Sequence, residues 1–195
     1  HTAVIPFGGN VITEDIKEGC SIIGNQAEQL KIKFGSAWPG ENKDSDIVSI
    51  PGLRGRDPKE ISLKNLANII QARVEEIIEL VHHEIKNSGY ENKLITGIVL
   101  TGGGSQLKHI GQLVEFHTGI ECRIGYPNEH IASTSPIDVS SPMYATGVGL
   151  VMKFLAEENG DELSSVQKGG TSNAGLGDFF KKMLDKIDKY LTNDE

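Results

Sequence analysis

The sequence is poor in cysteine, in positive charge and in long apolar runs, and each shortage narrows the classes of protein it can be. Only two cysteines stand in 195 residues, without paired spacing, which favours a reducing compartment. The formal net charge of −8 argues against nucleic acid as the main partner, because phosphate backbones require a basic footprint. No apolar run reaches the roughly 18 residues of a transmembrane helix, so we expect no membrane-spanning segment.

Motifs for metal binding and for hydrolysis are also missing. His82 and His83 are adjacent, so they face different sides of a helix, and no cysteine or carboxylate cluster completes a site around them. Ser105 lacks the Gly-x-Ser-x-Gly elbow of a hydrolase nucleophile. We therefore expect neither a metal site nor a catalytic residue in this chain.

The chain does contain a glycine-rich signal for a strand, a turn and a helix. A β-branched run over residues 96–100 reads as a buried strand, and Gly102–Gly104, hereafter the glycine turn, follow it. Glycines remove every Cβ, so a flat ligand can lie on the backbone, beside the N–H groups of a helix N-terminus. A nucleotide, most simply its nucleoside part, is the expected ligand. A turn without a ligand is the alternative, because the run lacks both Gly-Lys-Ser/Thr and Gly-x-Gly-x-x-Gly.

Periodicity along the chain predicts an α/β fold. Short β-branched runs predict strands at residues 2–7, 46–53, 96–100 and 121–124. Apolar residues at helical spacing predict helices that begin at Asn10, Asn25, Ser62 and Ser141, with a further helix around Leu113 and Phe116.

The C-terminal part changes character after residue 156. Residues 157–174 are polar and rich in glycine and serine, which predicts a flexible linker. Residues 175–195 read as an amphipathic helix. A long linker favours a helix that binds a membrane surface or a partner over one that folds back onto the domain. The apolar face of this helix consists of Leu176, Phe179, Phe180, Met183, Leu184, Ile187 and Leu191.

Glu28 and Lys31 lie three residues apart, so both project from one face of their helix. One interpretation is a surface ion pair, worth under about 1 kcal/mol. Alternatively, the carboxylate accepts hydrogen bonds from ribose hydroxyls while the lysine stem packs on a purine face. The spacing is compatible with both interpretations.

Taken in order, several segments resemble the FtsA family of bacterial cell-division proteins, which are actin-like and bind ATP. The resemblance runs from Thr2 to about Leu155, and the C-terminal amphipathic helix is similar to that family's membrane anchor. The segments that carry it are residues 5–16, 27–31, 97–104, 114–125 and 144–150.

The resemblance implies a ribonuclease-H-like, actin-type second lobe in residues 1–22 and 94–156, with a small α+β subdomain inserted at 23–93. In that family an N-terminal lobe and the two phosphate-gripping hairpins would precede His1, so the chain is expected to be a fragment. It would then lack the Mg²⁺ and phosphate half of an ATP site. We expect weak or undetectable binding of ATP by this chain and no hydrolysis.

The resemblance also implies the residues of the adenosine half-site. In actin-like ATPases an Ala-Glu-x-x-Lys helix supplies a glutamate for ribose and a lysine beside adenine, and glycines after a strand back the adenosine. Gln106 stands where heat-shock chaperone relatives carry an arginine that stacks on adenine. Ser105 would be a rim contact. The implied set is Glu28, Lys31, Gly102, Gly103, Gly104, Ser105 and Gln106.

The partners implied by the resemblance belong to bacterial division. In the family the small subdomain binds the acidic C-terminal tail of the tubulin-like protein FtsZ. The local cations that suit such a tail are Arg54, Arg56, Lys64 and Arg73, for which a solvated helix face is the alternative. Self-association into actin-like filaments and contacts with other division proteins are also implied. The resemblance further implies a location on the cytoplasmic face of the membrane at the division septum, where the C-terminal helix would meet the inner membrane surface.

Two other interpretations stay open from the residues. One is a fragment of an actin-fold sugar or metabolite kinase, which would need a substrate lobe and a catalytic aspartate. The other is a different actin-like filament protein, of rod-shape or pilus assembly.

Overall fold

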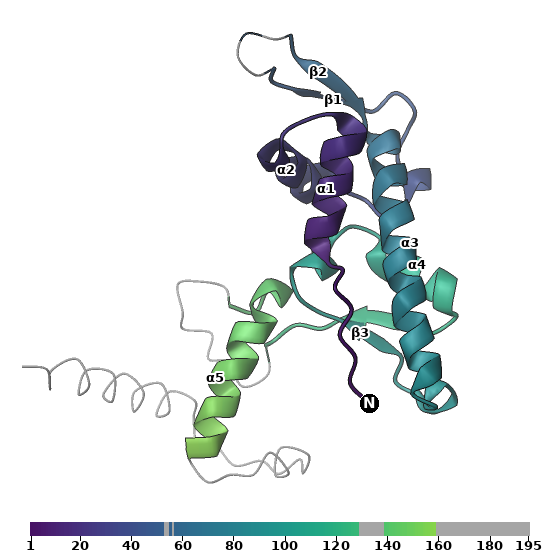
Figure 1. Ribbon diagram of the computed structural model, residues 1–195, viewed down its shortest axis with the longest axis vertical. Helices are drawn as coiled ribbons and strands as arrows, with labels where there is room; N and C mark the ends of the chain where they lie inside the picture. Colours follow the sequence, from purple (N-terminus) through teal and green to yellow (C-terminus); the bar gives the residue numbers. More distant parts are fainter. Residues whose placement is uncertain (53–54, 56, 129–138, 159–195) are drawn as a thin grey trace, which may run out of the picture. The chain divides into compact units, whose positions relative to one another are not determined.

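The computed structural model describes residues 1–52, 55, 57–128 and 139–158 (Figure 1). They belong to two compact units, residues 1–125 and residues 126–195, and each unit is described by itself. The predicted boundaries at 22/23, 93/94 and 156/157 divide the chain differently and stay predictions. The predicted linker lies almost wholly outside the described residues, and the predicted C-terminal helix lies entirely outside them.

The first unit is built on four helices: α1 (Gly9–Cys20), α2 (Gly24–Phe34), α3 (Leu63–Asn87) and α4 (Ile110–Thr118). The longest helix, α3, begins where expected, because the Ser62 hydroxyl accepts a hydrogen bond from the Asn65 amide and caps the helix. Helix α1 packs against both α2 and α3 (Figure 1). The helices predicted in these regions are confirmed.

Among the described residues, four short strands form two separate two-stranded sheets. Strands β1 (Ile47–Ile50) and β2 (Lys59–Ser62) pair antiparallel, whereas β3 (Ile98–Leu100) and β4 (Cys122–Ile124) pair parallel. The prediction of a buried strand before the glycine turn is wrong in its burial. Val99 is 46% exposed, and Ile98 and Leu100, which point to the other face of the strand, are only partly buried.

Two further expectations at the glycine-rich positions are corrected. No strand forms at residues 2–7, because no other described segment pairs with them, and Val4 stays 92% exposed. Two of the three glycines belong to a single 3-10 turn, η3 (Gly103–Gln106), and the α-helix begins only at Ile110. The N-terminus of an α-helix therefore does not directly follow the glycines.

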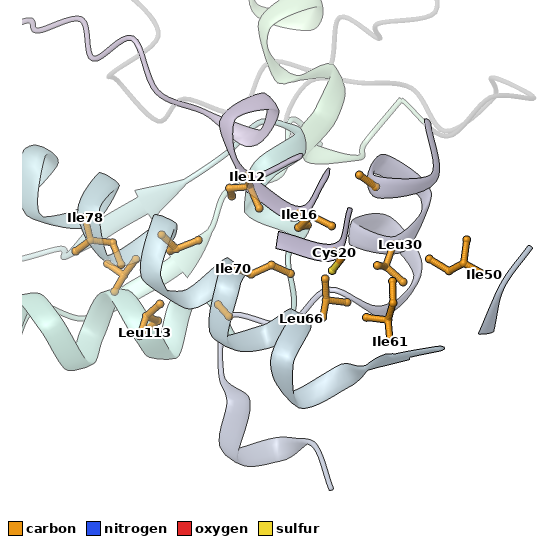
Figure 2. Close-up of a cluster of buried hydrophobic side chains, with 14 residues drawn as sticks. Ile12, Ile16, Cys20, Leu30, Ile50, Ile61, Leu66, Ile70, Ile78 and Leu113 are labelled. Atoms are coloured by element: carbon orange, nitrogen blue, oxygen red, sulfur yellow. The ribbon is translucent and has the colours of Figure 1, made fainter. Parts of the chain in front are cut away.

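The core of the first unit lies between the helices, and the hairpin of β1 and β2 closes one end of it (Figure 2). Ile16 of α1, Leu66 and Ile70 of α3, and Leu113 of α4 are the largest fully buried side chains. Burying such a side chain stabilises the fold by about 1.5–3 kcal/mol. This core fixes α1 against α3, and α1 is the element that meets both halves of the site described next.

In the second unit, the described part contains the 3-10 turn η4 (Pro142–Tyr144) and helix α5 (Ala145–Glu158). The helix predicted to open at Ser141 is confirmed, with Pro142 at its first turn. Several apolar side chains of α5 are exposed, among them Leu150 at 64% and Phe154 at 60%. Within the described residues, no helix has the length and apolar character that crossing a membrane requires.

Candidate functional site

A partly buried lysine joins helix α2 to the start of α1. The Lys31 ammonium group lies 2.9 Å from the carbonyl oxygen of Gly9, 2.8 Å from Thr13 Oγ1 and 2.7 Å from Glu28 Oε2. An ammonium group has three protons, so these three acceptors use its full donor capacity. The lysine side chain is 14% exposed. Lys31 therefore acts as a fixed link between two helices and does not present a mobile positive charge.

Thr13 completes this link from the side of α1. Its hydroxyl accepts from Lys31 and makes a hydrogen bond to Glu28 Oε2, while the Gly9 carbonyl oxygen lies 3.2 Å away as an alternative acceptor. The residue is 8% exposed, so the hydroxyl is largely shielded from water. Two neighbours thus hold one oxygen of the Glu28 carboxylate in place.

The second oxygen of Glu28 has no hydrogen-bond partner among the described residues, and the side chain is 42% exposed. Burial by itself would raise the pKa of Glu28. The hydrogen bonds from Lys31 and Thr13, together with the lysine charge, outweigh that effect and lower the pKa below its ordinary value of 4.5. At neutral pH the site therefore offers an ionised carboxylate whose second oxygen can accept hydrogen bonds from a ligand.

The glycine turn presents open backbone. Gly102 has φ +88°, in the region that favours glycine, and a Cβ at Gly102, Gly103 or Gly104 would meet no atom within 4 Å. In the described structure, no neighbouring atom would therefore clash with a side chain at these three positions. Their lack of side chains leaves a bare surface on which a ligand can lie.

The next two residues of the predicted site differ in exposure. Ser105 is 6% exposed and its hydroxyl donates to the Gly102 carbonyl oxygen at 2.8 Å, so it stabilises the turn from inside. Gln106 is exposed. Of the two, only Gln106 has a side chain that stands open to a ligand.

A pocket of about 260 Å³ connects the start of α1 with the glycine turn. Gly8 and Gly9 line it from α1, and Thr101, Gly104 and Ser105 line it from the end of β3 and the turn. Its interior is apolar and comes from α1, α3, β3 and α4. These lining side chains are Ile12, Val74, Ile77, Ile78, Val81, Ile98, Leu100, Ile110 and Val114, with Thr118.

Gly9 belongs to both parts of the site. Its carbonyl oxygen accepts from Lys31, and its backbone lines the same pocket as Gly104. The end of α2 also touches the exit of the turn, because the Ala37 amide donates to the Lys108 carbonyl oxygen at 2.8 Å. The Glu28–Lys31 pair is thus connected through Gly9 to the pocket that Gly104 and Ser105 line. Glu28, Lys31, Gly102, Gly103 and Gln106 are not among the residues that line this pocket.

Sequence reasoning missed three residues of this arrangement. Gly8 and Gly9 carry a signal that could have been used, because they follow a β-branched run and open a helix, as the glycine turn follows another. Thr13 carries none, since its contacts depend on a lysine from another helix.

The predicted cations for an acidic partner are already paired where the structure describes them. Arg73 makes a bidentate ion pair with Asp15, with Nη2 2.9 Å from Oδ1, and also contacts Glu76. The hydrogen bond to Asp15 is the main reason that the pKa of Arg73 is raised further. Lys64 lies 2.6 Å from Asp44 in an exposed pair. Arg54 and Arg56 lie outside the described residues.

Comparisons of this sequence with known proteins agree on one family. A family profile described as "Cell division protein FtsA" matches residues 1–149. The chain is 35% identical over 159 residues to the cell division protein FtsA of Pseudomonas aeruginosa, covering 82% of this chain and 38% of that protein. It is 32% identical over 184 residues to FtsA of Escherichia coli K12, covering 90% of this chain and 43% of that protein. The chain therefore spans less than half the length of these relatives.

Solved structures show the fold. MreB5 of Spiroplasma citri bound to ADP superposes with a TM-score of 0.56 at 19% identity, over 81% of this chain and 48% of that chain. The same protein bound to AMPPNP gives a TM-score of 0.54 at 21% identity, over 80% of this chain and 47% of that chain. The mixed α/β architecture is thus similar to part of an actin-like fold.

Proposed function

We propose that this chain, which belongs to the FtsA family of cell division proteins, supplies the nucleoside half of an ATP site in an actin-like division protein. The observation that carries the proposal is Gly9, which accepts from Lys31 and lines the pocket that Gly104 also lines. In this proposal the Glu28 carboxylate and the bare backbone of the glycine turn would face the same ligand. That combination suits the two parts of a nucleoside, because ribose offers hydroxyl donors and a base offers a flat face.

Each residue then has a distinct role. Glu28 accepts from the ribose hydroxyls through its second oxygen, since the first is held by Lys31 and Thr13. Lys31 contributes its aliphatic stem beside the base, because its ammonium protons are already used. Gly102–Gly104 back the adenosine, and Gln106 borders the adenine without the stacking that an arginine would provide.

The test is a titration of the isotope-labelled 195-residue chain with adenosine and with ATP, followed by amide NMR shifts. We expect saturable adenosine binding weaker than micromolar and ATP binding that is no tighter, because the proposed site contacts only the nucleoside. Glu28→Gln should weaken binding roughly tenfold, since a charged acceptor of the ribose hydroxyls becomes neutral. Glu18→Gln, an exposed position on α1, is the matched control and should bind as wild type. Absence of adenosine binding, or equal adenosine binding by Glu28→Gln, would contradict the proposal, whereas undetectable binding of ATP alone would not. Micromolar affinity for ATP by calorimetry would contradict a site limited to the nucleoside.

The wider role that we propose is a tether between the FtsZ ring and the cytoplasmic membrane at the division septum. The family assignment supports this role over a metabolite kinase or a rod-shape or pilus-assembly protein. The amphipathic pattern of residues 175–195 supports membrane binding by hydrophobic insertion. Flotation with liposomes tests this part. Deletion of residues 175–195 should abolish co-flotation, and unchanged flotation of the truncated chain would remove the tether from the proposal.

Binding of the acidic FtsZ tail is proposed for the cations near β1, β2 and α3. Arg73 can take part only if the partner's carboxylate replaces Asp15 or joins it. A tail peptide should bind the wild-type chain more weakly as salt rises. Charge reversal at Arg54 and Arg73 together should reduce that binding strongly. Binding unaffected by both reversals would remove this surface. Polymerisation and contacts with other division proteins are proposals of the same kind and rest on the family assignment alone.

A further inference from the structure

The end of helix α2 and the exit of the glycine turn form a close joint. The Ala37 amide donates to the Lys108 carbonyl oxygen at 2.8 Å, and Ser36 forms an isolated parallel bridge with Lys108. A Cβ on Gly35 would lie 3.0 Å from Leu107 Cδ1 and only 2.3 Å from the Lys31 carbonyl oxygen. The approach to Lys31 lies within the end of α2 itself and is what requires glycine at residue 35. The hydrogen bond from Ala37 to Lys108 puts two segments that are far apart in sequence in direct backbone contact.

One side-chain hydrogen bond spans the same joint. Ser36 Oγ lies 2.8 Å from His109 Nδ1, and Ser36 is 3% exposed. The hydroxyl also lies 3.2 Å from both the carbonyl oxygen and the amide nitrogen of Trp38. A serine hydroxyl donates once and accepts twice, so it is saturated if it donates to the carbonyl and accepts from the other two. That assignment places the imidazole proton on Nδ1.

His109 is an unusual residue for its backbone conformation. It precedes α4 with φ +63°, in the left-handed region that glycine and asparagine adopt most readily. Its side chain makes no capping hydrogen bond to α4. The His109 side chain instead makes a hydrogen bond to Ser36, although its own backbone adopts an unfavourable conformation.

We infer that the Ser36–His109 hydrogen bond is a clasp that sets the separation between the two sides of the proposed nucleoside site. Ser36 follows α2, the helix that carries Glu28 and Lys31. His109 follows the glycine turn, and the Leu107 amide ties this exit back to Gly104 at 3.2 Å. Opening the clasp would let α2 and the turn move apart. Ser36 and His109 are therefore positioning residues that touch no ligand, and the inference rests on the proposed function.

Variants at both ends of the clasp separate the hydrogen bond from the backbone conformation. His109→Gly keeps a residue suited to positive φ but removes the side chain, and Ser36→Ala removes the hydroxyl from the other side. His109→Asn keeps a residue that tolerates this conformation and places an amide N–H near the position of Nδ1. Adenosine affinity is measured by NMR titration of the full chain, and exchange of the Ala37 amide reports opening of the joint.

We expect His109→Gly and Ser36→Ala each to weaken adenosine binding roughly fivefold, the effect of one lost hydrogen bond. The double variant should be no weaker than either single variant, since both remove the same interaction. His109→Asn should bind within about twofold of wild type. Exchange of the Ala37 amide should accelerate in the two weakened variants and not in His109→Asn.

The outcomes separate failure of the clasp from failure of the proposed function. If the wild-type chain binds no adenosine, or Glu28→Gln binds as wild type, the proposed function fails and the clasp fails with it. If Glu28→Gln binds weakly while His109→Gly and Ser36→Ala bind as wild type, only the clasp is overturned. Additive losses in the double variant would also overturn it, because the two residues would then act separately. If His109→Gly does not fold, as judged by its amide spectrum, Ser36→Ala and His109→Asn carry the test.

Discussion

Replacing Thr13 with valine removes the hydroxyl that joins Lys31 to Glu28 and leaves the shape of the side chain almost unchanged. The variant loses the acceptor 2.8 Å from the lysine ammonium and the donor to the glutamate. Valine and threonine have similar helix propensities, so α1 itself should change little. The experiment therefore isolates one hydroxyl in the link between α1 and α2.

The expected loss in the free energy of unfolding follows from how far Thr13, Lys31 and Glu28 are each exposed to water. Thr13 is 8% exposed and Lys31 is 14% exposed, so the ammonium loses a hydrogen bond that water replaces only in part. A hydrogen bond to a charged group contributes about 1.5–3 kcal/mol, and Glu28 adds little because it is more than a third exposed. We expect the free energy of unfolding to fall by about 1–2 kcal/mol at pH 7.

The pH dependence of the free energy of unfolding gives a second test, because its direction can be predicted. The pKa of Glu28 is lowered in the folded chain, so its contribution to stability is complete above 4.5 and is lost as pH falls through the folded value. Thr13→Val should raise that pKa toward its ordinary value. The difference between variant and wild type should then be larger at pH 7 than below pH 4.5.

Urea unfolding followed by circular dichroism measures both effects, with Thr13→Ser as the control that keeps the hydroxyl. At pH 7 the Thr13→Ser variant should lose less free energy of unfolding than Thr13→Val, although serine makes less apolar contact. Equal losses for serine and valine, or a valine variant within about 0.3 kcal/mol of wild type, would refute the role assigned to this hydroxyl.

Two further substitutions test the framework that holds the site. Gly35→Ala should destabilise the chain by about 1–3 kcal/mol, because its Cβ would lie 2.3 Å from the Lys31 carbonyl oxygen, and thermal unfolding measures this. Gly24→Ala, where a Cβ meets nothing within 4 Å, is its control, and equal effects would contradict the close approach. Arg73→Leu should lower the urea midpoint by removing the pair with Asp15. Asp15→Asn should lower it as well, and a double variant that loses the sum of both single effects would show that the two residues are not coupled.

Local patterns in the sequence were sufficient for part of the fold and of the site. The periodic apolar residues of α3 predicted that helix because its buried face is a property of its own sequence. The spacing of Glu28 and Lys31 predicted only that both project from one helix face, and the structure places their charged atoms 2.7 Å apart. The glycine turn was also found from local sequence.

Features that depend on distant partners could not be predicted in this way. A strand was expected at residues 2–7, but β-branched residues form a strand only where another strand pairs with them. Strand β2 was missed because residues 59–62 include charged side chains and form a strand through pairing with β1. The ion pair of Arg73 with Asp15 could not be predicted either, because the two residues lie 58 residues apart in sequence.

The central claim is that Glu28 and the glycine turn face one nucleoside. Isotope-filtered NMR of the chain with adenosine measures this directly, through nuclear Overhauser contacts between ligand and protein protons. The account predicts contacts from the ribose protons to the Glu28 side chain and from the adenine protons to the Gly103 and Gly104 α-protons. Contacts confined to other residues, or ribose and adenine contacts to only one of these two elements, would contradict it.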